Sequence, residues 1–292
     1  MENEIMKKVV AVVLALALCL TCAFGLTACG GGEEEATTIT IAVPNDTSNE
    51  ARALLLLQEL GYITLDPEAG ITATITDITE NPYNIEFNEV EAAQLPNVLQ
   101  DVDYAIINSN FAIDAGINPT EDALALEGAF SAYGNILAVK AGNEEKPEIL
   151  ALKAALESKA VADYITETYG GGVVSTVENP GDGYNADIDY AALEGTEITV
   201  AASPAPHAEI LAIAKDILAE KGITLKILEF TDYVQPNNVV DSGEVDANYF
   251  QHVPYLDDFN AQNGTEIVSV GAIHVEPMGI YGGKQASLDA IQ

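Results

Sequence analysis

The sequence predicts an α/β fold of two lobes with a ligand cleft between them. Along residues 38–280, short apolar runs alternate with segments of helical period, which is typical of a mostly parallel sheet covered by helices. Residues 177–196 are rich in Pro, Gly and Asp and have no apolar periodicity, so they separate two α/β units. The strand-like runs end in polar or aromatic residues, and ligands bind beyond the carboxyl ends of strands in open α/β sheets.

Composition sets limits on the class of protein. A chain of 292 residues with 48% hydrophobic residues is long and apolar enough for one or two globular domains. It carries 46 acidic against 11 basic residues, a net charge of −35. This charge argues against binding to nucleic acid and against a basic membrane-binding surface.

Residues 1–28 have the pattern of a signal peptide. Lys7 and Lys8 precede an apolar run at 9–20, and residues 26–30 form a small-residue cleavage site around Cys29. The cleavage site resembles a bacterial lipobox, in which the cysteine carries lipid such as palmitate and becomes the mature N-terminus. A plain secretory signal or a short membrane anchor is the alternative, although the apolar run is short for a membrane span.

The lipobox predicts a lipid anchor on Cys29 and a location on the extracytoplasmic face of the cell membrane. Residues 29–37 then form a flexible acidic tether. The other two cysteines, Cys19 and Cys22, leave with the signal peptide. The mature chain is therefore expected to have no internal disulfide and no cysteine metal site.

In the first unit, a helix at 48–60 follows the first strand. Thr47 and Glu50 form a T-x-x-E capping box, which makes Thr47 the expected N-cap, and Gly61 ends the helix. A second helix at 91–101 contains Pro96, which is expected to break it. The expected strands are 39–43, 71–75, 84–87 and 104–107.

The rest of the first unit, and the second unit after residues 177–196, follow the same alternation. Pro147 is expected in the first turn of a helix that runs to 157, and a second helix spans 159–169. A third helix opens at 203–207 and ends at Gly222, with apolar residues at i, i+3, i+4 and i+7. The expected strands are 135–140, 198–202, 225–230, the strand that ends at 245–252, and 267–270.

Arg52 is the only arginine in the chain. An arginine makes a rigid two-pronged contact with a carboxylate or phosphate that lysine makes poorly. Arg52 falls in the second turn of the first helix, where the helix dipole disfavours a cation. A small anionic or zwitterionic ligand would offset this cost, and a structural salt bridge to one of the many carboxylates would do the same. The residues alone leave both interpretations open.

Several segments resemble the methionine-binding lipoproteins, the substrate-binding subunits of methionine ABC importers. They are ITVAASPAPHAEIL at 198–211, FTDYVQPN at 230–237, DANYFQH at 246–252 and VEPMGIY at 275–281, with further similarity at 41–57 and 108–112. The resemblance covers roughly 36–175 and 197–290. It implies a two-lobed fold of the periplasmic-binding-protein type.

The order of these segments differs from the family. The Ala-Ser-Pro segment normally comes first and the Pro-Asn-Asp segment later, so the chain looks circularly permuted. The resemblance then implies one lobe at 38–112 and a second at 113–280, within which 177–196 joins the family's usual ends. Residues 281–292 return to the first lobe. Permutation is tolerated where exposed termini lie close together.

The resemblance implies capture of an amino acid, L-methionine first, and delivery to the importer's permease and its ATPase. Arg52 holds the ligand carboxylate in this interpretation, and Tyr233 and Phe250 flank a thioether, which favours aromatic walls. Asn108 and His252 are further contacts, and Glu276 faces the ammonium. Asn49 and Tyr249 are the remaining candidates. No cofactor and no metal is expected.

Two other functions, metal binding and catalysis, have less support in the sequence. His207, His252, His274 and Glu276 offer the donors of a zinc site, which would make the chain a metal-binding lipoprotein. Their spacing has no H-x-x-x-H pattern, and zinc would repel Arg52. The sequence contains no G-x-S-x-G, no P-loop, no G-x-G-x-x-G and no Cys–His pair, so no enzyme activity is expected.

Overall fold

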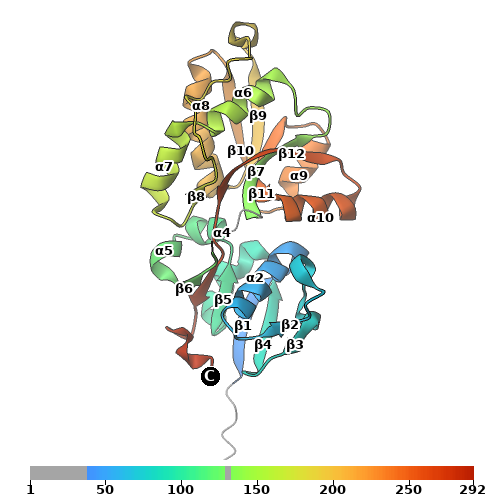
Figure 1. Cartoon of the computed structure of the whole chain (residues 1–292), viewed down its shortest axis with the longest axis vertical. Coiled ribbons are helices and arrows are strands. Elements are labelled where there is room, and N and C mark those ends of the chain that lie inside the picture. The colour runs from blue at the N-terminus through green and yellow to red at the C-terminus, as the bar shows by residue number, and fades with distance from the viewer. Residues whose placement is uncertain (1–37, 129–132) are drawn as a thin grey trace, which may run out of the picture. The chain divides into compact units, whose positions relative to one another are not determined.

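The computed structural model describes residues 38–128 and 133–292. The predictions for the signal peptide, Cys29 and the tether fall outside these residues. Within the described part, no helix combines the length and the apolar character that a membrane span needs. Residues from Thr38 to Gln292 form one compact unit, and its two main sheets define the two lobes (Figure 1).

The first lobe is built on a five-stranded sheet in the order β4-β1-β5-β13-β6. β1 pairs in parallel with β4 and β5, as the α/β pattern predicts. β13 is antiparallel to β5 and to β6, so a strand near the end of the sequence completes the sheet. The strands are Ile39–Pro44 (β1), Ile85–Val90 (β4), Tyr104–Ile107 (β5), Ala123–Leu126 (β6) and Gly279–Gly282 (β13).

The second lobe contains a six-stranded sheet in the order β10-β9-β11-β7-β12-β8. β9 is parallel to β10 and β11, whereas β7 is antiparallel to β11 and β12. The sheet is therefore mixed. The strands are Gly134–Lys140 (β7), Val174–Ser175 (β8), Glu197–Ala202 (β9), Thr224–Glu229 (β10), Ala247–His252 (β11) and Ile267–Val275 (β12).

The helices of the second lobe confirm most of the predicted pattern. The expected first-turn position of Pro147 is confirmed in α6. The helix predicted from 203 is interrupted, because Pro204–Ala208 forms a π-type turn in which Ala205 is not helical. The helices are Pro147–Leu156 (α6), Lys159–Tyr169 (α7), Glu209–Ala219 (α8), Gln235–Asp241 (α9) and Val253–Asn263 (α10).

In the first lobe, α2 (Thr47–Glu59) carries Arg52, and its N-cap differs from the prediction. Asp46 is the N-cap, and its Oδ1 accepts hydrogen bonds from the Asn49 amide at 3.0 Å and from Asn49 Nδ2 at 2.8 Å. The Glu50 carboxylate accepts from the Ile75 amide instead. The predicted capping box at Thr47 is therefore wrong, because Asp at the preceding position already satisfies the first free amides.

The strand predicted at 71–75 is also wrong. The segment forms 3-10 turns, in which the Asp77 carboxylate accepts from the amide and the hydroxyl of Thr74. These local bonds satisfy backbone groups that a strand would leave for a partner. The remaining short elements of this lobe are Thr64–Leu65 (β2), Ile78–Glu80 (β3), Leu95–Val98 (α3), Ser109–Asp114 (α4) and Pro119–Asp122 (α5).

The predicted helix at 91–101 is broken into three short pieces. α3 has Pro96 within its first two positions, between the 3-10 turns Ala92–Gln94 and Leu99–Asp101. The break predicted at Pro96 thus separates short turns, since proline removes one backbone donor and clashes with the preceding turn. Elsewhere, Tyr190–Leu193 is a 3-10 turn inside the predicted loop, and Leu288–Ala290 is another near the C-terminus.

Two segments cross between the sheets. The chain leaves the first sheet after Leu126 and enters the second at Gly134, and it returns between Val275 and Gly279. Sheet membership differs from the expected division at 112 and 280, because β6 pairs with β13 in the first lobe. The last residues also contact this lobe, where Tyr104 donates a hydrogen bond to the carbonyl of Ser287 at 2.6 Å.

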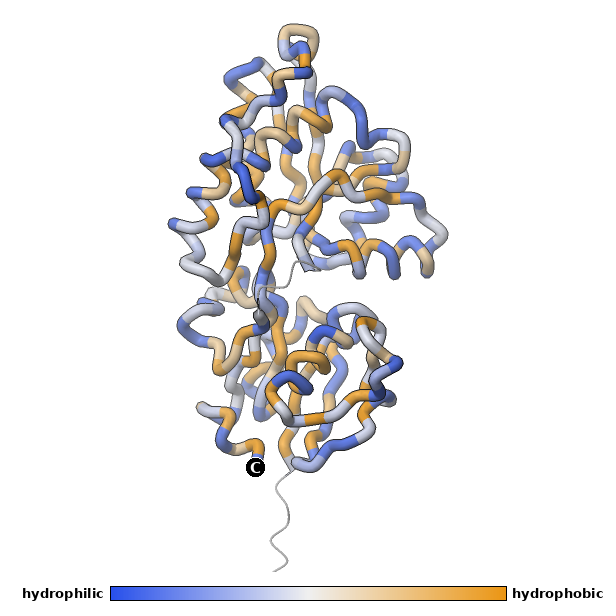
Figure 2. The backbone as a smooth tube through the Cα atoms, in the orientation of Figure 1, coloured by the Kyte–Doolittle hydropathy of each residue, from blue (hydrophilic) through white to orange (hydrophobic). Residues whose placement is uncertain are grey.

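Each lobe has its own apolar core. In the first lobe, β1 and β5 pack their apolar side chains against α2, with Leu54 and Leu57 fully buried. In the second, β9 packs against α6 and α8 through residues such as Leu152 and Leu211. Burial of one such side chain contributes about 1.5–3 kcal/mol. Hydrophobic residues accordingly follow the strands of both lobes in Figure 2.

Candidate functional site

A small cavity of about 20 Å³ lies where residues of the two sheets meet. Its walls combine one cation, one carboxylate, several amides and three aromatic rings. The lining residues are Asn49, Arg52, Asn108, Ser109, Asn110, Asn135, Tyr233, Phe250, Gln251, His252, Tyr255 and Glu276.

Arg52 reaches the cavity from the second turn of α2, and it also makes the structural ion pair that the sequence left open. Its Nε donates to both carboxylate oxygens of Glu127 at 3.0 and 2.8 Å, and its Nη2 donates to Oε2 at 2.5 Å. Nη2 also donates to the Glu276 carbonyl at 2.6 Å. The described residues offer no hydrogen bond to Nη1. Arg52 thus serves the fold and lines the cavity at the same time.

Asn108 follows β5 at the carboxyl edge of the first sheet. Its Nδ2 donates to Asn49 Oδ1 at 2.8 Å. Its own Oδ1 is buried without a hydrogen-bond partner among the described residues. A buried acceptor of this kind costs about 1–3 kcal/mol when it stays unpaired. A ligand N–H in the cavity would satisfy it.

Aromatic rings line the second-lobe side of the cavity. The ring centroids of Tyr233 and Phe250 are 5.8 Å apart, and those of Tyr233 and Tyr255 are 5.7 Å apart. Tyr233 also contacts the first lobe, since its hydroxyl donates to Asn110 Oδ1 at 2.7 Å and its ring lies 4.7 Å from that of Phe111. Tyr233 therefore joins the two walls of the cavity.

His252 ends β11 and caps α10. Its Nδ1 accepts a hydrogen bond from the Tyr255 amide at 3.2 Å, and its Nε2 lies 3.4 Å from Asn49 Oδ1. Burial lowers the pKa of His252 to about 3, and the charge of Arg52 contributes to the same shift. His252 is thus neutral at physiological pH, with Nε2–H directed to the first lobe.

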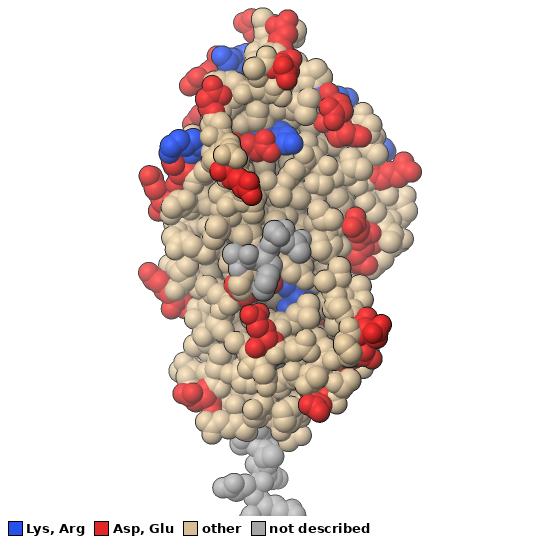
Figure 3. Space-filling model, in the orientation of Figure 1, with Lys and Arg blue, Asp and Glu red and all other residues tan. Residues whose placement is uncertain are grey.

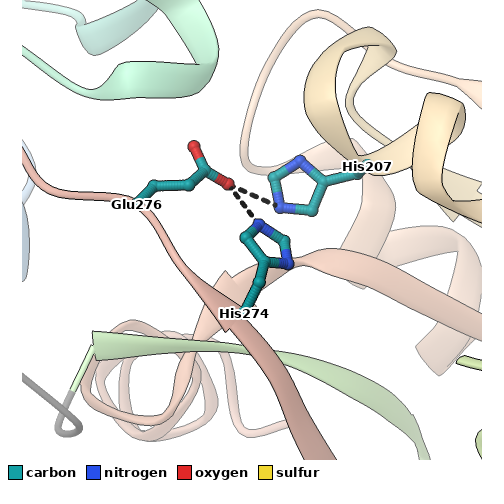
Figure 4. Close-up of side chains that lie close together, drawn as sticks. All are labelled: His207, His274 and Glu276. Carbon is teal, nitrogen blue, oxygen red and sulfur yellow. Dashed lines mark hydrogen bonds and ion pairs between the residues drawn. The ribbon is translucent and has the colours of Figure 1, made fainter. Parts of the chain in front are cut away.

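Two histidines lie against the carboxylate of Glu276 (Figure 4). His274 Nε2 lies 2.7 Å and His207 Nε2 lies 3.2 Å from the same oxygen, Oε1. Burial lowers the pKa of each histidine to about 3 and raises the pKa of Glu276. Both rings are therefore neutral. His274 donates its Nε2–H to the carboxylate, whereas the hydrogen bond of His207 Nε2 is to Asn135 Oδ1. The Tyr249 hydroxyl pairs with His274 Nδ1.

His207, His274 and Glu276 do not form, together with His252, the zinc site that the sequence suggested. Donor atoms of His207, His274 and Glu276 lie within 4.8 Å of one another. His252, the fourth member of that set, instead contacts Asn49 and Tyr255. His274 Nε2 already donates to Glu276, and His207 Nε2 is hydrogen-bonded to Asn135 Oδ1. The cluster is better described as support for one buried carboxylate, and the zinc alternative is not favoured.

The structure brings together seven of the eight predicted site residues. Tyr249 is the exception, because its ring packs in the core of the second lobe and its hydroxyl meets His274. The side chains on either side of it in β11 point to the opposite face of the sheet, because side chains alternate along a strand. The other predicted residues line the cavity: Asn49, Arg52, Asn108, Tyr233, Phe250, His252 and Glu276.

Five cavity residues were not predicted, and most had a signal nearby. Ser109 and Asn110 continue the polar end of β5, and Gln251 lies between two predicted contacts. Tyr255 is in the first turn of α10, after His252. Asn135 had no such signal, because it lies at the start of β7 and not beyond a carboxyl end. It is placed there by its bond to His207 Nε2 at 3.0 Å.

Comparison with known proteins gives matches of about half a chain in length. Membrane lipoprotein TpN32 of Treponema pallidum is 47% identical over 135 residues, which are 46% of this chain and 50% of that protein. D-methionine-binding lipoprotein MetQ of Yersinia pestis is 37% identical over 136 residues, again 46% and 50%. The chain thus spans about half the length of the curated relatives it matches.

A solved nutrient-binding protein from Burkholderia cenocepacia, bound to methionine, is 46% identical and covers 47% of this chain and 58% of its own, with a TM-score of 0.46. The family model described as NlpA lipoprotein matches two segments, 36–177 and 198–292. The unmatched interval between these segments nearly coincides with the loop predicted at 177–196. Since the two segments together include most of the sequence, the chain belongs to the NlpA lipoprotein family.

Proposed function

We propose that this chain is a substrate-binding lipoprotein that captures methionine between its lobes and presents it to an ABC importer. Family membership and the relatives named for methionine binding support this function. The observation that carries it is the composition of one cavity. A guanidinium, a carboxylate and aromatic rings converge there, which is what a zwitterion with an apolar side chain needs.

The ligand's charged groups have complementary partners in the cavity. Arg52 Nη1 takes the α-carboxylate, and nearby amide N–H groups add to that contact. Glu276 and the unpaired Oδ1 of Asn108 accept from the α-ammonium. Because these groups are buried, each contact is stronger than it would be in water.

The thioether is placed against the aromatic wall. Sulfur contacts with aromatic rings are worth roughly 0.3–1.5 kcal/mol each. Tyr233, Phe250 and Tyr255 form this wall from the second lobe. A branched aliphatic side chain would fill the space less well, because methionine is unbranched and adapts to an irregular cavity.

Ligand contacts from both lobes stabilise the closed form. Tyr233 and His252 face Asn110 and Asn49 across the cavity, so a ligand between them adds contacts that an open form lacks. Differential affinity for the closed state then drives closure. The closed form docks on the permease, and a lipid on Cys29 keeps the protein at the extracytoplasmic face of the membrane. We propose binding and delivery, without a catalytic step.

Figure 3 agrees with a role that needs neither nucleic acid nor a basic membrane-binding face. Acidic side chains are spread over the face shown, with only a few basic ones among them.

We also propose that the family's two halves are permuted in this chain. The unmatched interval between 177 and 198 supports this, because it is where the family's usual ends would be joined.

Calorimetric titration of residues 30–292 tests the proposal. L-Methionine, D-methionine, leucine, glutamate and Zn²⁺ are titrated separately, and methionine is expected to bind most tightly. Arg52→Lys should weaken methionine binding about tenfold or more, because a lysine ammonium cannot keep the Glu127 contacts and still direct a fixed N–H to the ligand carboxylate, as the planar guanidinium does. Asp163→Asn, which removes the exposed pair Lys159–Asp163 in α7, is the control and should leave affinity unchanged.

No heat of binding with any amino acid would refute the proposed function. A tight response to Zn²⁺ alone would revive the metal-binding alternative. Unchanged methionine affinity in Arg52→Lys would make Arg52 purely structural.

A further inference from the structure

Glu127 is a buried carboxylate that does not line the cavity. It is 8% exposed and follows directly after β6. Both of its oxygens accept from Arg52, as described above. Its Oε2 also accepts from the Met278 amide at 3.1 Å. A buried carboxylate with this many donors is fixed in one orientation.

The bonds of Glu127 and Arg52 join both crossing segments. Glu127 lies where the chain leaves the first sheet, and Met278 lies where it returns. Arg52 reaches the return segment as well, through the carbonyl of Glu276. The ring of Tyr133, at the far end of the first crossing, lies 4.5 Å from Arg52 Cζ. The return segment is further held by Ser109, whose hydroxyl donates to the Pro277 carbonyl at 2.5 Å.

We infer that Glu127 is the positioning residue of the ligand site: it orients Arg52 toward the ligand carboxylate and couples that contact to both crossing segments. The identity of the ligand in this inference rests on the proposed function. The contacts of Glu127 do not depend on that function. Glu127 touches no ligand. It acts by fixing two of the three guanidinium nitrogens.

The physical reason lies in the geometry of the guanidinium. A bidentate carboxylate fixes the plane of the group. Among the described residues, Glu127 and the Glu276 carbonyl hold Nε and Nη2, which leaves Nη1 for a ligand. Pre-ordering removes a side-chain entropy cost that binding would otherwise incur. A ligand held by Arg52 is thereby connected to the two segments that cross between the lobes.

The sharpest test uses Glu127→Asp, because aspartate keeps the charge and shortens the reach. L-Methionine and L-methioninamide, which lacks the anionic carboxylate, are titrated into both proteins. We expect the variant to lose about tenfold in methionine affinity and less than threefold in methioninamide affinity. The ratio of the two affinities reports the carboxylate contact alone, since both ligands share the rest of the molecule.

An equal loss for both ligands, or no loss for methionine, would overturn the positioning role. Asp163→Asn is again the matched control, because it opens an ion pair in α7 that touches neither crossing segment. Its ratio of affinities should equal that of the unaltered protein.

A second measurement does not depend on any ligand. Hydrogen exchange in the ligand-free protein should be faster at residues 276–280 in Glu127→Asp, because the Met278 amide loses its acceptor. Unchanged exchange there would contradict the coupling even if the proposed ligand were wrong. If Glu127→Asp fails to fold, Glu127→Ala, which also removes the acceptor of the Met278 amide, gives the same exchange readout.

Discussion

At the residue scale, three histidines are neutral: His252 lines the cavity, and His207 and His274 lie against Glu276, which also lines it. His207, His252 and His274 are all buried, and burial lowers the pKa of each to about 3. A histidine that must stay neutral in the fold contributes stability above its unfolded pKa, near 6.5. That contribution is lost as the pH falls toward 3, because the unfolded chain binds the proton and the folded chain does not.

This linkage gives a prediction for His252→Gln. The variant should be less stable than the unaltered protein at pH 7, and the difference should shrink as the pH falls from 6.5 to 4. The slope should be at most about 1.4 kcal/mol per pH unit, the value for one proton. Denaturant unfolding at several pH values measures it. A difference in stability that does not vary with pH would show that His252 titrates normally in the fold.

The contribution of Glu276 to stability depends on pH in the opposite direction. Burial raises its pKa, so it contributes stability below its unfolded pKa, and this is lost as the pH rises through the folded value. Comparing a variant with the unaltered protein cancels this term from the histidine measurement, provided that the substituted residue does not contact Glu276. His252 meets that condition better than His207 or His274, both of which lie against it.

At the scale of elements, α2 and its N-cap decide where Arg52 lies. Asp46 satisfies the Asn49 amide and also holds the Asn49 side chain, whose Oδ1 in turn accepts from Asn108. The N-cap residue Asp46 therefore helps to position Asn49, which lines the cavity. A change at the start of the helix should alter both stability and the arrangement of the cavity amides.

Asp46→Ala and Thr47→Ala form a matched pair. Loss of an N-cap costs about 0.5–2 kcal/mol, so Asp46→Ala should lower the free energy of unfolding by about 1 kcal/mol, and Thr47→Ala should change it by less than half of that. Chemical denaturation of both variants measures the difference. A larger effect for Thr47→Ala would restore the capping box that the sequence suggested.

The elements also show how much the sequence could predict. Strands such as β1 and β5 are continuous apolar runs with polar ends, and the site residues beyond them were recognisable for the same reason. The segment at 71–75 has an equally regular alternation, yet the bonds of Thr74 to Asp77 replace strand pairing. β6 was missed because its four residues, Ala123–Leu126, become a strand only by pairing with β13 from the far end of the sequence.

The candidate site shows the same division. Arg52 could be singled out because it is the only arginine, but its partner could not. Glu127 is one of 46 acidic residues, and only the fold selects it, across 75 positions of sequence. Asn135 and the pairing of His207 and His274 with Glu276 likewise depend on contacts between distant segments.

At the scale of the whole molecule, chain order and spatial arrangement are separable. Ile39 and Ile291, near the two ends of the described chain, pack in the same core. β1 and β13 both flank β5. The cavity is formed by residues that meet in space, so joining these ends and opening the loop at 177–196 should leave it intact.

A reordered chain tests this. Residues 197–292, a short Gly/Ser linker and residues 38–176 restore the order expected for the family. We expect the reordered protein to unfold cooperatively and to bind methionine within about threefold of the original, because loop closure changes little with such a linker. Circular dichroism and calorimetry measure the two properties. A folded protein without binding would show that chain order itself shapes the site.

The central claim is that one amino acid is held between the lobes by Arg52 on one side and Glu276 on another. A crystal structure of residues 30–292 grown with L-methionine tests it most directly. The account predicts methionine in the cavity, with its carboxylate at Arg52 Nη1, its ammonium at Glu276 and Asn108, and its thioether against Tyr233 and Phe250. Methionine bound elsewhere, or a cavity in which Arg52 contacts only Glu127 while methionine binds in solution, would contradict it.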